Sequence, residues 1–207
     1  MKHYPITEHF YSLQGEGENV GKPAYFLRLS GCNVQCKFCD SKNSWDDANA
    51  EKLSSEKIVE LIKKSDAKNV VITGGEPLLH DLDELCHALR THIPKVCLWL
   101  ETSGTARFSG NFDWVCLSPK KQKLPLFENY KKANELKVVI ENSDDFEFAE
   151  TQAKQVNPDC QLFLQGEWSA LNCRDARPCV STAIIDYILK HPKWRLSVQI
   201  HKILNIQ

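Results

Sequence analysis

The sequence has little net charge and no long apolar segment. Its 27 acidic residues nearly balance its 26 basic ones, for a formal net charge of −1, so no charge imbalance indicates non-specific binding to nucleic acid or to an anionic membrane. Residues 1–5 contain no apolar signal segment, and no stretch approaches the length of a membrane-spanning helix. No repeat, low-complexity tract or linker is visible, so we expect one domain over residues 1–207. We therefore expect a cytoplasmic protein with no membrane partner and no direct nucleic-acid partner.

Cysteine is plentiful, but its pattern does not indicate a disulfide framework. The nine cysteines are an odd number, and thiols stay reduced in the cytoplasm, so ligation of a metal or cluster explains them better. Cys32, Cys36 and Cys39 fall within eight residues in the spacing C-x3-C-x2-C, directly after a predicted strand. Cys173 and Cys179 flank a basic loop and are candidates for a second metal pair.

The cysteine triplet fits one kind of cofactor best. Three thiolates can hold three irons of a [4Fe–4S] cluster and leave the fourth iron open to a small ligand. No nearby histidine or fourth cysteine completes a tetrahedral zinc site. Two alternatives stay open: a zinc knuckle completed by a distant ligand, and a redox pair of Cys36 and Cys39 that would leave Cys32 unexplained. A chance cluster of core cysteines fits poorly, because Asn33, Gln35 and Lys37 between them are polar and typical of a loop.

Short apolar runs alternate with amphipathic segments along the rest of the chain. We expect strands over residues 24–29, 69–73, 96–100, 114–117, 136–140, 161–164 and 195–200. We expect helices from Ser54 or Ser55 past Ile62, through residues 82–89, from 144 to about 156, and over 183–190. The last helix is expected to bury Ile184, Ile185, Ile188 and Leu189. Residues 4–13 have a mixed pattern.

This alternation of strands and helices predicts right-handed crossovers and a parallel sheet. The crossovers after Glu101 and after Ser118 are too short or too polar for full helices. A complete eight-fold barrel takes about 250 residues, and this chain has 207. We therefore expect an α/β fold in the form of a partial, open (incomplete) TIM-like β/α barrel.

Polar clusters follow the predicted strands one after another. In β/α barrels the chemistry lies at the carboxyl ends of the strands. The turn Gly74-Gly75-Glu76-Pro77 combines glycines that let the backbone approach a ligand with a carboxylate that suits an ammonium partner. Arg28 is either an exposed strand residue or, at the barrel mouth, a bidentate carboxylate clamp. His201 is either a ligand contact, a general acid or a plain surface residue. Hydrogen-bonding groups at further strand ends are Glu101, Ser118, Lys120 and Gln165.

The cysteine loop and the Gly-Gly-Glu-Pro turn together resemble the radical S-adenosylmethionine (SAM) enzymes. The resemblance implies that the open iron is chelated by the amino and carboxylate groups of SAM. It also implies that the reduced cluster cleaves SAM to a 5′-deoxyadenosyl radical.

A longer set of motifs, in order along nearly the whole chain, resembles one family within that superfamily, the 7-carboxy-7-deazaguanine synthases. The matching segments are 13–17 (LQGEG), Arg28 with the Cys39-Asp40-Ser41 run, 73–77 (TGGEP), 101–102 (ET), 118–120 (SPK), 134–140 (NELKVVI) and 194–202 (WRLSVQIHK). The resemblance implies conversion of 6-carboxy-5,6,7,8-tetrahydropterin into 7-carboxy-7-deazaguanine with loss of ammonia, on the route to queuosine. It further implies a carbon–nitrogen lyase, a homodimer, and an external electron donor such as a flavodoxin or ferredoxin-like protein.

The same resemblance assigns site residues by matching position. The cluster ligands would be Cys32, Cys36 and Cys39. Residues expected beside SAM are Phe38, Cys39, Asp40, Gly75, Glu76, Glu101, Ser118, Pro119, Lys120 and Gln165. Residues expected at the pterin are Leu13, Gln14, Gly15, Glu16, Arg28, Thr73, His201 and, through the terminal carboxylate, Gln207. Ser41, where a threonine is familiar, would hold Mg²⁺ together with substrate oxygens, which suits a hard cation.

Two other functions stay open at this point. Another small radical SAM enzyme, such as a glycyl-radical activase, would carry the cysteine triplet but need no pterin pocket. A zinc-binding interaction module would use the same cysteines for structure, although a long β/α chain has little need of a metal to fold.

Overall fold

The structure, a computed structural model, describes residues 2–48, 50–171 and 179–207. Within these residues, one sheet of nine strands runs through the molecule in the order β3-β1-β2-β4-β5-β6-β7-β8-β9. The strands are β1 (His3–Leu13), β2 (Pro23–Leu29), β3 (Glu51–Ser54), β4 (Asn69–Gly74), β5 (Cys97–Thr102), β6 (Trp114–Leu117), β7 (Glu135–Ile140), β8 (Gln161–Gly166) and β9 (Trp194–Ser197).

Most of the sheet is parallel, as the alternating pattern predicts. Strands β2, β4, β5, β6, β7, β8 and β9 pair in parallel, in chain order. No pairing between β9 and β3 closes the sheet among the described residues, so the barrel is open. The predicted partial barrel is confirmed. The carboxyl ends of these strands share one edge, where side chains from different strands can meet.

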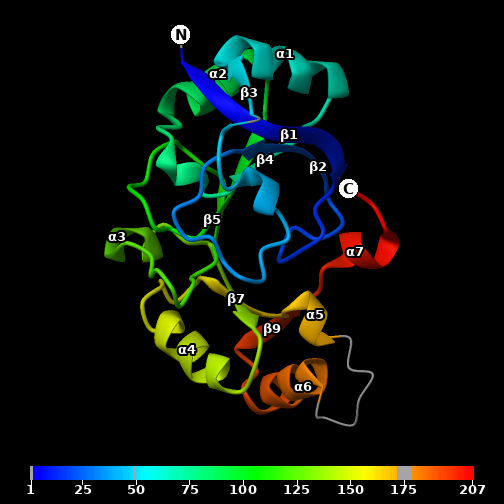
Figure 1. The fold of residues 1–207 in the computed structure, drawn as a ribbon, viewed down its shortest axis with the longest axis vertical. Helices are drawn as coiled ribbons and strands as arrows, with labels where there is room; N and C mark the ends of the chain where they lie inside the picture. The colour runs from blue at the N-terminus through cyan, green and yellow to red at the C-terminus, as the bar shows by residue number, and fades with distance from the viewer. Residues whose placement is uncertain (1, 49, 172–178) are drawn as a thin grey trace.

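The N-terminal end of the sheet differs from the prediction. Residues 4–13 belong to the long strand β1, which pairs antiparallel with β2 on one side and with β3 on the other. The tip of β1 continues into the turn Gln14–Gly17, and the last helix, near the C-terminus, lies beside this turn (Figure 1). The pairing joins segments far apart in sequence, which the local pattern of residues 4–13 does not reveal.

The described helices either pack against the sheet or lie at its carboxyl edge. They are α1 (Ser55–Ser65), α2 (Asp83–His92), α3 (Phe127–Tyr130), α4 (Asp144–Ala153), α5 (Trp168–Leu171), α6 (Val180–Lys190) and α7 (Ile200–Leu204), with 3-10 turns η1 (Lys42–Ser44) and η2 (Pro77–Leu79). Ser54 caps α1, since its side chain accepts a hydrogen bond from the Lys57 amide. The crossover from β5 to β6 contains no helix, and that from β6 to β7 contains only the short α3, as expected.

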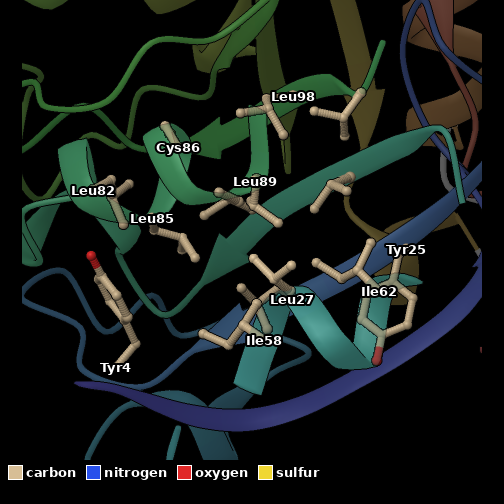
Figure 2. Close-up of a cluster of buried hydrophobic side chains, with 14 of the residues drawn as sticks. Tyr4, Tyr25, Leu27, Ile58, Ile62, Leu82, Leu85, Cys86, Leu89 and Leu98 are labelled. Atoms are coloured by element: carbon tan, nitrogen blue, oxygen red, sulfur yellow. The ribbon is translucent and has the colours of Figure 1, made fainter. Parts of the chain in front are cut away.

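Among the described residues, the two largest apolar cores pack the sheet against its helices. Figure 2 shows Leu27 of β2 and Leu98 of β5 pointing into the space filled by Ile58, Leu85 and Leu89 from α1 and α2. A second core lies between β7, β8 and the helices α4 and α6. Because each core packs the sheet against its helices, the strand ends that carry polar residues are held in fixed positions.

The prediction for α6 is partly wrong. Ile184 is fully buried and Ile188 packs against the second core. Ile185, by contrast, is 48% exposed and Leu189 77% exposed. The helix presents only one stripe to the sheet, and these two residues lie outside it.

The structure also corrects the last predicted strand. β9 ends at Ser197 and the chain turns into helix α7 from Ile200, so residues 198–200 are not strand. None of the described helices is long and apolar enough to cross a membrane.

Candidate active site at the carboxyl edge of the sheet

A cavity of about 480 Å³ opens at the carboxyl ends of the parallel strands. It is bounded by the cysteine loop, by the strand ends from β2 to β8, by the turn after β1, and by the C-terminal segment. All the residues that the sequence proposes for cluster, SAM, pterin and magnesium line it, except Glu76 and Pro119. Candidates taken from segments across the whole chain thus converge on one space.

The cysteine loop is fastened to the sheet by its backbone. Gly31 and Cys32 donate hydrogen bonds to the carbonyls of Ser44 and Trp45, at 2.9 and 3.0 Å. The Glu76 amide donates to the Gly31 carbonyl at 2.7 Å. Within this frame Cys36 is buried, while Cys32 and Cys39 are half-buried, and all three line the cavity.

These thiols suit an iron–sulfur cluster. Burial raises the pKa of the Cys36 thiol, and the positive charge of Lys120 opposes that shift. An iron–sulfur cluster would offset the cost of forming a buried thiolate, since thiolates bound to iron are deprotonated outright. Among the described residues, no three His, Cys, Asp or Glu side chains are grouped to hold a single metal ion. Cluster thiolates each bind their own iron and so need not converge on one point.

Gly75 explains why the turn after β4 contains glycine. A Cβ at Gly75 would lie 2.3 Å from the Gly31 carbonyl oxygen, 2.7 Å from the Ser44 carbonyl oxygen and 2.8 Å from the Cys32 Cβ. Because two of these atoms are backbone, an added methyl group has to push the cysteine loop away. The glycine therefore sets the distance between the turn and the first cysteine.

We expect Gly75→Ala to destabilise the fold by about 1–3 kcal/mol, as overpacking does, and to lower iron incorporation. Denaturant unfolding and iron analysis measure the two effects. Gly21→Ala is the control. A Cβ at Gly21 meets no atom within 4 Å, so this substitution brings the backbone strain of a φ of +81° but no steric clash. Equal iron content in both variants would contradict the role given to Gly75.

Glu76 does not line the cavity, in contrast to its expected place beside SAM. Its side chain is fully buried, and its carboxylate accepts hydrogen bonds from the Leu78 amide (2.9 Å), the Thr102 hydroxyl (2.6 Å) and the amide and hydroxyl of Ser103. With these partners it ties η2 to the end of β5. In this structure it contributes no atom to the cavity wall, and an ammonium group in the cavity would have to compete with these bonds.

A buried ionic cluster lies beneath the cavity. The Lys137 Nζ, in the middle of β7, contacts Glu16 Oε2 at 2.6 Å and Glu101 Oε2 at 3.0 Å. Gln14 Nε2 donates to Glu101 Oε1 at 3.1 Å, and Gln199 Nε2 donates to Glu16 Oε1 at 2.7 Å. Glu16 and Gln14, which the sequence assigns to the pterin, are thereby joined to Glu101, which it assigns to SAM.

This cluster keeps Glu16 ionised. Burial by itself would raise the pKa of Glu16, but the Lys137 charge and the hydrogen bonds from Lys137 and Gln199 outweigh it and lower the pKa to about 2. The Glu16 side chain is therefore a hydrogen-bond acceptor at the cavity throughout the neutral range.

The depressed pKa predicts an acid-dependent loss of stability. A carboxyl group with a folded pKa of about 2 against an ordinary 4.5 stabilises the fold by up to about 3 kcal/mol above pH 4.5. That contribution is lost as the pH falls from about 4.5 toward 2. Denaturant unfolding of metal-free protein from pH 7 to pH 3 should show this slope, and Glu16→Gln should flatten it. A Glu16→Gln variant with an unchanged acid slope would refute the assignment.

Arg28 faces the cavity from the end of β2, opposite Thr73 of β4 in the parallel register. Its Nε donates to Glu8 Oε1 at 2.7 Å, and Nη1 makes a long contact of 3.5 Å with the Gly74 carbonyl. Glu8 thus fixes the guanidinium from behind and leaves its terminal nitrogens for a carboxylate in the cavity.

The C-terminal segment forms one side of the cavity. The Ile200 amide donates to the Gly15 carbonyl at 3.0 Å. The His201 ring lies so close to Gly15 that a Cβ added to Gly15 would be 2.1 Å from His201 Nδ1. Burial lowers the pKa of His201. Lys202 Nζ pairs with Asp40 Oδ2 at 2.8 Å. This segment, which includes Gln207, therefore connects the turn after β1 to the cysteine loop.

Several cavity residues were missed by sequence reasoning. They include Glu8, Lys137, Gln199 and Lys202. Only Lys137 gave a signal, as a lone lysine in the apolar strand 136–140. Cys173, one half of the suggested second metal pair, lies outside the described residues.

The comparisons with known proteins agree with this geometry. The family model of a 4Fe-4S single cluster domain matches residues 13–123. The 7-carboxy-7-deazaguanine synthase of Flavobacterium psychrophilum is 47% identical, with 98% of this chain and 92% of that protein covered. The enzyme of that name from Synechocystis sp. is 44% identical, over 99% of this chain and 94% of that protein. The crystal structure of QueE from Escherichia coli superposes with a TM-score of 0.82 at 30% identity, covering 95% of this chain and 94% of that one.

An open β/α barrel with a cysteine triplet at the carboxyl edge of its sheet defines a radical SAM protein of the single-cluster type. Within that class, the sequence identity to relatives over nearly the full chain shows the family. This chain belongs to the 7-carboxy-7-deazaguanine synthase family. The relatives are named as an enzyme, and the matching family model describes a 4Fe-4S cluster domain. These findings argue against the alternative of a zinc-binding interaction module.

Proposed function

We propose that this chain is a radical SAM enzyme that converts 6-carboxy-5,6,7,8-tetrahydropterin into 7-carboxy-7-deazaguanine with loss of ammonia. The observation that carries the proposal is the shared cavity, which brings the three thiols of the cysteine loop together with Arg28 and the Gln14–Gly17 turn. When bound, a reduced [4Fe–4S] cluster and SAM supply a 5′-deoxyadenosyl radical. The protein's own contribution is to hold the two reactants in one place and orientation.

The cofactor side of the cavity is the cysteine loop and the neighbouring strand ends. Cys32, Cys36 and Cys39 are the ligands that suit iron, and Phe38 and Asp40 lie beside them in the wall. Lys120 is anchored by the carbonyl and hydroxyl of Ser118 at 2.7 and 2.6 Å, which fixes its charge next to Cys36. Glu101, Gln165 and Gly75 complete the polar groups proposed to contact SAM.

The substrate side is the turn after β1 with Arg28, Thr73 and the C-terminal segment. Arg28 is oriented to pair with the pterin carboxylate, because Glu8 already holds its Nε. Gln14 and ionised Glu16 offer an amide and an acceptor to the polar edge of the pterin. His201 and the terminal carboxylate of Gln207 close the other side, and Gly15 admits the ring of His201.

Ser41 is proposed to hold Mg²⁺ together with oxygens of the substrate. It lines the cavity next to Asp40, to which its hydroxyl donates at 3.3 Å. A hydroxyl and water suit this hard cation, which keeps much of its hydration.

The remaining parts of the proposal concern class and setting. Loss of ammonia makes the enzyme a carbon–nitrogen lyase in the route to queuosine, with residues 1–207 acting as one domain. A cluster that must be reduced needs an external electron donor, for which we propose a flavodoxin or ferredoxin-like protein. Reduced thiol ligands fit the cytoplasm, and we propose a homodimer that binds neither membrane nor nucleic acid directly.

The proposal is tested by an anaerobic assay. Cluster-loaded protein, SAM, Mg²⁺ and dithionite are incubated with the carboxypterin, and the product is sought by mass spectrometry alongside released ammonia. The expected result is equal amounts of 7-carboxy-7-deazaguanine and ammonia. A tetrahydropterin without the carboxylate is the matched control and should give no product. Cleavage of SAM with no pterin-derived product would move the assignment to another radical SAM reaction, such as activation of a glycyl-radical enzyme.

A further inference from the structure

Lys137 stands out among the groups that the proposed function does not use. Its side chain is 5% exposed, and its single ammonium contacts carboxylates from two different elements, Glu16 in the turn after β1 and Glu101 at the end of β5. A buried lysine normally has one partner or loses its charge. Burial by itself would lower the pKa of Lys137, but the surrounding acidic groups of Cys116, Glu101, Glu16 and Glu135 outweigh burial and raise the pKa well above its ordinary value.

The turn that Lys137 contacts is also held by hydrogen bonds to two strands, β7 and β9. The Gly17 amide donates to Ser197 Oγ at 3.1 Å, and the Glu18 amide donates to Glu135 Oε2 at 3.1 Å. Gly17 has a φ of +65°, and a Cβ there would lie 2.0 Å from Glu135 Oε1, so there is no space for any other residue. Glu135 and Lys137 lie two residues apart on β7, hence on the same face of the sheet. The turn therefore rests on that face of β7.

Of these two β7 residues, Lys137 is the one whose side chain contacts the cavity-lining residues Glu16 and Glu101. Glu135 holds the backbone of the turn from below, whereas Lys137 holds the Glu16 side chain and, through Glu101, the amide of Gln14. Without the ammonium, the Glu16 side chain would keep the hydrogen bond from Gln199, and the half-buried carboxylates of Glu16 and Glu101 would lose the cation that now lies between them. Their repulsion would move both the turn and Glu101.

We propose that Lys137 is a positioning residue that sets the Gln14–Gly17 turn and Glu101 relative to each other. Resting on the proposed function, this means that one side chain aligns the substrate side of the cavity with the cofactor side. A loss of Lys137 should weaken the binding of both reactants, whereas a loss of Glu16 should weaken the pterin alone.

The test compares Lys137→Met, which keeps the length and removes the charge, with Lys137→Arg, which keeps the charge. Lys57→Met is the control, because Lys57 forms an exposed pair with Glu60 on α1. The first readout is hydrogen exchange of the Gly17 and Glu18 amides in cluster-loaded protein, which needs no turnover. We expect exchange at least about tenfold faster in Lys137→Met than in wild type, unchanged exchange in Lys57→Met, and protection largely restored in Lys137→Arg.

The second readout separates positioning from a purely structural role. We expect Lys137→Met to raise the KM for the pterin and the dissociation constant for SAM at least about tenfold each, and Glu16→Gln to raise only the former. Unchanged exchange at Gly17 and Glu18, or faster exchange spread evenly over the chain in both Lys137 variants, would overturn the proposal. If the pterin is not the substrate, wild-type protein forms no product, yet amide exchange and SAM affinity still decide the role of Lys137.

Discussion

Cys36→Ala is expected to abolish product formation, with a fall of at least about a thousandfold, or about 4 kcal/mol of lost transition-state stabilisation. Cys36 is the most buried thiol of the loop, lying between Cys32 and Cys39 in the wall of the cavity. Two remaining thiolates cannot hold three irons, so the variant should lose iron, acid-labile sulfide and SAM cleavage along with the product. The measurement is turnover under anaerobic conditions, with iron and sulfide analysis of the same samples.

Cys86→Ala provides the matched control. Cys86 is equally a buried thiol, but it belongs to the first apolar core and does not line the cavity. Its replacement should cost about 1 kcal/mol of stability and leave iron content and turnover near wild type. A Cys36→Ala protein that kept both its iron and its product would refute the ligand assignment.

Arg28→Gln is expected to raise the KM for the carboxypterin about a hundredfold, or about 3 kcal/mol, the scale of a charge-assisted bidentate pair. The physical reason is that the guanidinium, fixed by Glu8, faces the cavity with its terminal nitrogens. SAM affinity should stay near wild type, because the residues proposed to contact SAM lie on the cysteine loop and at the ends of other strands. Steady-state kinetics with varied pterin, and SAM titration of the same protein, measure the two quantities.

Two further variants sharpen this test. Arg28→Lys keeps the charge but lacks the planar fork, so it should recover only part of the affinity. Arg90→Gln removes a guanidinium from an exposed pair with Asp113, outside the cavity, and should leave the KM unchanged. An Arg28→Gln variant with wild-type KM would place the carboxylate elsewhere.

The site was largely predictable because of a geometric rule. Parallel strands bring their carboxyl ends to one edge, so polar residues such as Glu101, Ser118 and Gln165, which follow different strands, had to meet. The cysteine spacing and the family motifs supplied the rest. What spacing could not show was that Glu76 turns inward, since its four hydrogen bonds come from η2, from the last residue of β5 and from Ser103, which follows β5.

The errors in the fold share a cause. β1 and β3 form an antiparallel edge through pairings between distant segments, and the mixed polarity of residues 4–13 reflects a strand whose two faces meet different surroundings. The apolar pattern predicts a strand that continues to residue 200, but Gln199 turns toward Glu16 and the chain enters α7. Lys137 was read as one residue of an apolar strand, because its two carboxylate partners are distant in sequence.

One cavity at this edge of the sheet is proposed to hold substrate and cofactor together. The most direct test of this proposal is a crystal structure of the cluster-loaded protein grown anaerobically with SAM and the carboxypterin. We expect the pterin between the Gln14–Gly17 turn and α7 with its carboxylate on Arg28, and SAM between the cysteine loop and the ends of β5 and β6. A pterin bound outside this cavity, or one that displaces SAM from it, would show that the two do not share the site.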